Sequence, residues 1–171
     1  MRWANMSIEY SVLIKEKKIT EAILIKKLQL MGYSCNMIEK LSKGINIDLN
    51  EAIGFSVYLI DVDNYPYNSF DTIFEKEEFI FQQILGFRYI KEYDDLQTRY
   101  NTMLTLIFDI IIELQGEAIF IDSNDTEVCL FKGESKICLM NKSGIWDRNF
   151  FRNIIKDKEV IYFEDLEKIK T

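Results

Sequence analysis

The stretch "TMLTLIFDIIIELQGEAIFI", Thr102–Ile121, is the most apolar part of the chain and decides its fold class. A membrane-spanning helix needs about 20 uninterrupted apolar residues, but this stretch contains acidic side chains and is broken by Gly116. On a helical period its polar residues fall on one stripe, and its apolar residues fill the other faces. The stretch therefore predicts an amphipathic helix in a protein core, followed by a separate strand after Gly116.

The ends of this helix, and of an earlier one, carry recognisable signals. Asp94 or Asp95 can cap the first turn of the long helix, because an aspartate accepts a hydrogen bond from a free backbone N–H. Thr20 can cap the earlier helix in the same way. Gly116 and Gly32 stand where the two helices are expected to stop, since glycine readily adopts the conformation that follows a last helical turn.

The rest of the chain is predicted to be mainly strands, because its β-branched and aromatic segments are bounded by turn residues. The segment 78–93 favours a strand by its alternation, and Gly86 within it is a candidate β-bulge. A short amphipathic helix presenting Trp146 is expected at 146–157, and 163–171 is expected to be a last helical turn or a frayed end. The other expected strands are 8–15, 44–50 and 52–62 (joined tightly around 50–51), 117–122, 127–133 and 136–141.

These elements predict an α+β fold. Strands follow strands more often than they alternate with helices, as is typical of that class. We expect an antiparallel β-sheet with two main helices packed on one face and the other face partly open. The chain has 171 residues, which is an ordinary length for one domain. Residues 1–171 are therefore assigned to a single domain, with residues 1–6 either disordered or upstream of the true start.

Negative charge is concentrated in the middle of the chain. Residues 61–134 hold 5 basic and 16 acidic side chains, which gives 5 − 16 = −11, within a total of 21 − 28 = −7. Each flank, 1–60 and 135–171, carries 8 − 6 = +2. An acidic surface repels nucleic-acid phosphates and anionic lipids and attracts basic partners. We expect neither nucleic acid nor a membrane as a partner, although an acidic surface can also serve solubility alone.

The three cysteines, Cys35, Cys129 and Cys138, indicate a reducing compartment. They are an odd number and form no CxxC pair, and their apolar neighbours are typical of buried thiols. The start of the chain lacks the apolar core and the cleavage site of a signal peptide. The expected location is the cytoplasm.

Composition excludes several kinds of catalysis. The chain has no histidine, which removes Ser-His-Asp triads, Cys-His pairs and His-ligated zinc. It also has neither the GxxxxGK[ST] nor the GxGxxG phosphate motif. The acidic loops 61–65 and 122–127 begin like calcium loops but lack the required glycine and the closing glutamate, so they are interpreted as turns with hydrogen-bonded Asx side chains. We expect no enzyme activity, no cofactor and no metal.

A candidate partner-binding surface lies at 61–78, with 92–95 beside it. The loop around Pro66 is rich in Asn, Asp and aromatic residues, which is typical of an exposed connection. Its carboxylates could steer a basic partner, and its aromatic side chains could supply contact area. An acidic run such as Glu75, Glu77 and Glu78 is usually a solvated face, and a docking surface is the alternative interpretation. The candidate residues are Asp61, Asp63, Tyr65, Tyr67, Phe70, Asp71, Glu75, Glu77 and Glu78.

Four segments together resemble a known family: "SIEYSVLI", "GFRYIKEYDDLQTRYNTMLTLIFDII", the hairpin "EAIFIDSNDTEVCLFKGESKICLMN" and the following "IWD". The chain, from about Met6 to Ile155, resembles the immunity proteins of bacterial swarming-inhibition (Sit-type) polymorphic toxins. The resemblance implies a small cytoplasmic protein that binds and neutralises one cognate toxin domain without catalysis. It carries over no catalytic or contact residues, and the Pro66 loop and the acidic run are longer here than in the family pattern.

Three hypotheses remain open at this stage. The first is an immunity protein for a basic toxin domain such as a nuclease, with the chain itself a monomer or a weak homo-oligomer. The second is an enzyme that uses carboxylates and a divalent metal in a cleft. The third is a structural module that self-associates through an exposed sheet edge or through the C-terminal segment 149–155.

Overall fold

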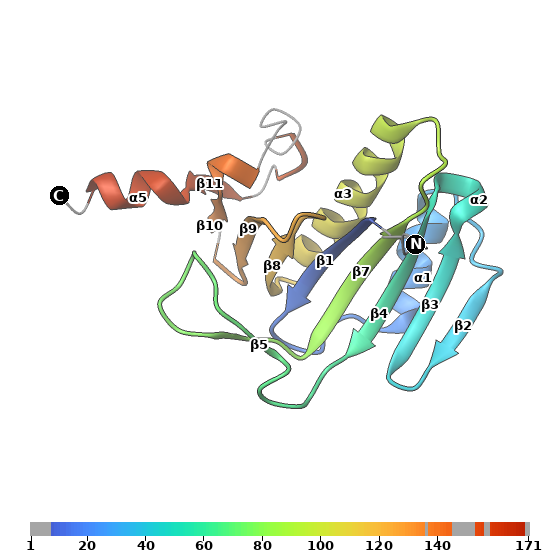
Figure 1. Cartoon of the computed structure of the whole chain (residues 1–171), viewed down its shortest axis with the longest axis horizontal. Coiled ribbons are helices and arrows are strands. Elements are labelled where there is room, and N and C mark those ends of the chain that lie inside the picture. Colours follow the sequence, from blue (N-terminus) through green and yellow to red (C-terminus); the bar gives the residue numbers. More distant parts are fainter. Residues whose placement is uncertain (1–7, 136, 145–152, 156–157, 170–171) are drawn as a thin grey trace, which may run out of the picture.

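A computed structural model describes residues 8–135, 137–144, 153–155 and 158–169. Its main feature is a nine-stranded sheet in which every neighbouring pair is antiparallel except β10 and β11, which are parallel (Figure 1). The strands, in spatial order, are β11 (Glu159–Tyr162), β10 (Ile137–Met140), β9 (Glu127–Lys132), β8 (Glu117–Ile121), β1 (Ile8–Ile14), β7 (Gln83–Tyr89), β4 (Phe55–Asp61), β3 (Gly44–Leu49) and β2 (Ile38–Leu41).

The described helices are α1 (Glu21–Leu30), α2 (Asn50–Ile53), α3 (Leu96–Glu113) and α5 (Phe163–Ile169). Both predicted caps are confirmed: Thr20 Oγ1 accepts a hydrogen bond from Ile23 N at 3.2 Å, and Asp95 Oδ1 accepts one from Thr98 N at 3.0 Å. α3 ends as expected before Gly116, but Gln115 takes the left-handed conformation with φ 50°. No helix in the described part of the chain is long and apolar enough to cross a membrane.

The sheet has a separate apolar core on each face. Side chains alternate along β1, so Val12 and Ile14 join the larger core whereas Leu13 joins the smaller one. The larger core also contains the buried side chains of α1 and α3. The smaller core lies over β1, β8, β9 and β10, and its other members include Phe74, Phe79 and Phe81 from the connection between β4 and β7.

That connection, residues 62–82, is called the insertion below. It contains a small two-stranded sheet of β5 (Ser69–Phe70) and β6 (Phe79–Ile80). Val62 N donates to Gln82 O at 2.8 Å and closes its base. Figure 1 shows the insertion leaving the end of β4 and extending toward β9 and β10 before it returns to β7. It thereby covers part of the sheet face that carries the smaller core.

Several sequence predictions need correction. Pairing runs through Gly86 without a break on both sides of β7, so the predicted bulge is wrong. The glycine is needed instead because a Cβ there would lie 1.9 Å from Cζ of the Tyr58 ring. The expected tight link at 50–51 is the one-turn helix α2. The strands β2 and β11 were not predicted. The C-terminal segment, expected to be a last helical turn or a frayed end, forms the helix α5. The helix predicted at 146–157 lies mostly outside the described residues, as do residues 1–6.

A buried arginine secures the corner where α3 begins. Arg99 is only 4% exposed, and its Nη1 donates to Ile90 O at 2.7 Å and to Gly54 O at 3.3 Å. The guanidinium carbon lies 4.2 Å from the centroid of the Tyr89 ring and 5.4 Å from that of Tyr93. The first turn of α3 is thus tied to the end of β7 and to the turn that follows α2.

Substitution of Gly86 tests the close approach of the Tyr58 ring. Gly86→Ala should lower the free energy of unfolding by about 1–2 kcal/mol, because the new methyl group must displace the ring. In a Tyr58→Ser background the same change should be neutral or stabilising, since alanine suits a strand better than glycine. Urea denaturation of the four proteins measures this coupling. Gly116→Ala is the control, because the atom nearest to its new Cβ, Ile111 O, would be 4.0 Å away. If Gly86→Ala lowered the free energy of unfolding equally in both backgrounds, the explanation from the Tyr58 ring would be contradicted.

Candidate partner-binding surface

The base of the insertion carries Asp61 and Asp63, and the structure pairs both with lysines. Lys17 Nζ lies 3.2 Å from Asp61 Oδ2, and Gln83 Nε2 donates to Asp61 Oδ1 at 3.1 Å. Lys43 Nζ lies 2.8 Å from Asp63 Oδ1. The hydrogen bond and the charge of Lys43 lower the pKa of Asp63. These two carboxylates therefore contribute less free negative charge than the sequence suggested.

Tyr65 and Tyr67 are the most exposed aromatic side chains of the insertion, at 66% and 84%. The Tyr65 hydroxyl donates to Glu78 Oε2 at 3.1 Å, and this hydrogen bond raises the pKa of Tyr65. Two of the predicted residues, Tyr65 and Glu78, are therefore in direct contact although they are 13 positions apart. Tyr67 makes no side-chain hydrogen bond within the described parts of the chain, and its ring is exposed to solvent.

The remaining predicted residues divide between core, ion pair and free surface. Phe70 is partly buried in the smaller core and pairs with Phe79 across β5 and β6. Glu75 Oε1 lies 2.6 Å from Lys132 Nζ of β9. Asp71 and Glu77 are exposed, and neither makes an ion pair with any residue that the structure describes.

A residue that the sequence analysis missed holds the insertion in place. Glu127 of β9 is 8% exposed, and its carboxylate accepts hydrogen bonds from the Thr72 hydroxyl and from Ile73 N, the latter at 3.0 Å to Oε2. This contact spans 54 positions, so no local pattern announces it. The sequence contains only one indication of a buried polar contact here, which is the glutamate in the otherwise apolar segment "EVCLF".

The segment 92–95, expected beside 61–78, lies elsewhere. It follows β7, and the end of β7 at Tyr89 pairs with Phe55, at the opposite end of β4 from Asp61. A seven-residue strand such as β4 spans roughly 20 Å. Asp95 is also occupied by capping α3. Residues 92–95 therefore do not form one surface with residues 61–78.

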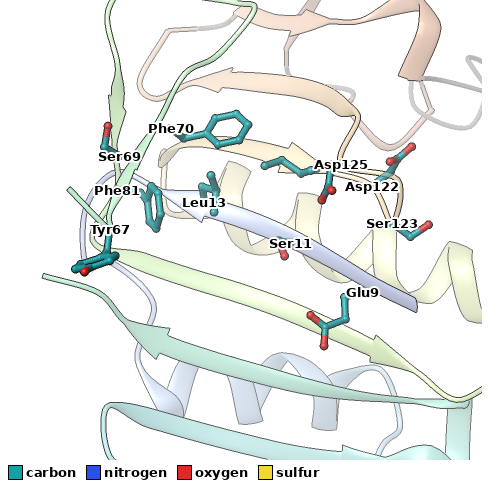
Figure 2. A pocket seen from close by; sticks show the side chains of 11 residues that line it. Glu9, Ser11, Leu13, Tyr67, Ser69, Phe70, Phe81, Asp122, Ser123 and Asp125 are labelled. Atoms are coloured by element: carbon teal, nitrogen blue, oxygen red, sulfur yellow. The ribbon is translucent and has the colours of Figure 1, made fainter. Parts of the chain in front are cut away.

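A hollow of about 690 Å³ lies between the insertion, β1 and the turn after β8. Figure 2 shows Tyr67, Phe70 and Phe81 at one end of it, and Asp122, Ser123 and Asp125 at the other. The residues of β1 that line it are Glu9, Ser11 and Leu13.

The polar end of the hollow is well defined. Asp122 Oδ1 accepts hydrogen bonds from Asn124 N at 2.8 Å and from Thr126 N at 3.1 Å, which confirms the predicted Asx turn. Asp125 takes the left-handed conformation with φ 58°. Glu9 Oε1 accepts a hydrogen bond from Arg88 Nε at 2.7 Å. The hollow thus combines carboxylates with aromatic rings, which suits docking of a cationic group.

Removal of the Glu127 carboxylate tests how the insertion is held. In Glu127→Ala the Ile73 amide should exchange its hydrogen at least about tenfold faster, because it loses its acceptor while the sheet stays paired. Glu127→Gln, which keeps one carbonyl oxygen, should show a smaller increase. Hydrogen-exchange NMR with the amides of β7 as an internal reference measures both. Unchanged exchange at Ile73 in the alanine variant would show that the apolar contacts alone hold the insertion.

Comparisons of the chain with protein-family models, with curated proteins and with solved structures found no match. The resemblance to Sit-type immunity proteins therefore stays a prediction from the sequence. What the chain does has to be inferred from the charge, exposure and geometry of its own residues.

Proposed function

We propose that this chain is an immunity protein, which binds one basic toxin domain and neutralises it without catalysis. The observation that carries the proposal is the combination of apolar exposure and acidic charge on the insertion. Residues 62–82 contain 1 basic and 5 acidic side chains, which gives 1 − 5 = −4. Among the described residues, four of the nine large exposed apolar side chains also lie there: Tyr65, Tyr67, Ile73 and Ile80.

The two properties have different roles in binding. Exposed carboxylates raise the rate at which an oppositely charged partner arrives. Buried aromatic and aliphatic side chains supply most of the free energy once the complex has formed. Asp71 and Glu77 provide the exposed negative charge, and Tyr67 and Ile73 provide the apolar contact area. The Glu127 contact and the smaller core hold the insertion in one shape, which lowers the entropy lost on binding.

The architecture favours approach from one side. We infer that α1 and α3, which share the larger core, together cover one face of the sheet, so that a partner meets the opposite face. A nuclease toxin would fit this chemistry, because its nucleic-acid cleft must be basic and an acidic surface can occupy it. The three free cysteines, two of them buried, favour a cytoplasmic site of action.

Charge reversal on the insertion tests the proposal. The double variant Asp71→Lys and Glu77→Lys should lower the association rate constant with the toxin domain encoded beside the gene by about tenfold or more at low salt, because steering is lost. Neither carboxylate makes an ion pair with a residue that the structure describes, so stability should change little. Stopped-flow association at several salt concentrations measures the effect.

The matched control makes the same charge change elsewhere. Glu51→Lys and Asp109→Lys alter two exposed carboxylates on α2 and α3, away from the insertion. This control should keep most of the association rate. If both double variants slow association equally, net charge alone matters, and if neither does, the insertion is not the binding surface. Absence of any complex by calorimetry would end the immunity proposal.

Self-association is the second candidate, and the free edge of β2 favours it. Exposed Met37 and Ile38 lie at this edge of the nine-stranded sheet. A two-fold antiparallel pairing centred on the strand would however set Glu39 or Lys40 against its own copy, which is unfavourable. Sedimentation velocity over a hundredfold range of concentration decides this, since a strict monomer removes the candidate.

A further inference from the structure

We infer that the hollow between the insertion and β1 receives an arginine side chain of the partner, an inference that rests on the proposed function. The hollow has a volume of about 690 Å³ and two chemically different ends. A single arginine carries both of the matching parts, a planar cation and an apolar stem.

The polar end favours a cation. Its lining includes Asp122 and Asp125 from the turn after β8 and Glu9 from β1, and no lysine or arginine lines the hollow in the described part of the chain. Asp122 uses Oδ1 for its own turn, which leaves its other oxygen for a ligand. Glu9 is partly neutralised by Arg88 at 2.7 Å, so the turn carboxylates supply most of the attraction.

The two ends taken together favour arginine over lysine. Tyr67, Phe70 and Phe81 gather there, and the Tyr67 ring is 84% exposed although nothing in the described fold requires an exposed ring at that place (Figure 2). A guanidinium binds carboxylates through a rigid fork of N–H groups and is weakly hydrated, whereas an ammonium is a compact and strongly hydrated charge. The apolar stem of the arginine can meanwhile lie along the aromatic rings. The hydroxyls of Ser11 and Ser123, which also line the hollow, can accept the remaining N–H groups.

A partner, rather than a second copy of this chain, fits the hollow. The chain carries a net charge of −7, so a second copy would bring like charge to an acidic site. The hollow is also lined by Tyr67, one of the exposed apolar side chains of the insertion. An arginine seated there would lie within the area that the partner is proposed to cover, where tyrosine and arginine anchors are most effective.

The test uses small probes and the full chain. Nα-acetyl-L-arginine amide is titrated into ¹⁵N-labelled protein, alongside the lysine amide and the citrulline amide, which keeps the shape of arginine without its charge. The amide signals of Ser11, Ser123 and Asp125 should shift saturably with the arginine probe in the millimolar range that a fragment of this size permits. The lysine probe should bind at least threefold more weakly, and the citrulline probe should cause no saturable shift.

Substitutions at the polar end of the hollow test whether the arginine probe binds there. Asp122→Asn with Asp125→Asn removes two charges but keeps the turn, because an asparagine Oδ1 accepts the same hydrogen bonds and asparagine tolerates the left-handed conformation. This double variant should raise the dissociation constant of the arginine probe at least threefold. Asp109→Asn on α3 should leave it unchanged. Equal binding of the arginine and lysine probes, no shift at these amides, or full binding by the double variant would overturn the inference.

Failure of the inference and failure of the proposed function can be told apart. If the toxin domain binds while the arginine probe does not shift the hollow, immunity stands and the arginine site is wrong. If the probe binds as expected but no toxin domain forms a complex, the hollow is a cation site and the immunity proposal falls. If both bind, the Asp122→Asn and Asp125→Asn variant should weaken the toxin complex at least tenfold.

Discussion

The packing of α3 against the sheet is the interaction on which the rest of the structure depends. Half of its 18 residues are buried, and one of them, Met103, accepts a hydrogen bond at Sδ from the Tyr89 hydroxyl of β7 at 3.2 Å. Phe108 contacts Phe131 of β9 with ring centroids 5.3 Å apart, and Tyr100 contacts Tyr10 of β1 at 5.8 Å. Because one helix contacts several strands, it fixes how the two halves of the sheet join at β1. The side chains that α3 buries are consequently unavailable to a partner.

The fold could be predicted where the sequence signals are local. The helix caps at Thr20 and Asp95 and the Asx turn at Asp122 depend on side chains within four positions, and all three are present. β2 and β11 were missed because their segments are only four residues long, and β2 carries two charges at an edge. Gly86 was misinterpreted because its role depends on Tyr58, a cross-strand neighbour that the sequence does not reveal.

The candidate surface was predictable in composition but not in arrangement. The sequence showed that residues 62–82 are rich in acidic and aromatic side chains. It did not show that two of the carboxylates pair with lysines from distant segments of the chain. Lys43 and Lys132 each neutralise a carboxylate, at Asp63 and Glu75. A count of charges along a chain therefore overestimates the field that a partner meets, since it cannot distinguish carboxylates that stabilise the fold from those that remain available.

The Arg99 corner has a consequence for how the protein responds to its medium. The groups that hold this buried cation are the backbone carbonyl oxygens of Gly54 and Ile90 and the rings of Tyr89 and Tyr93. Burial also shields the contact from mobile ions. The joint between α3 and β7 is consequently insulated from ionic strength, so added salt weakens the field of the exposed carboxylates while the framework beneath them keeps its shape.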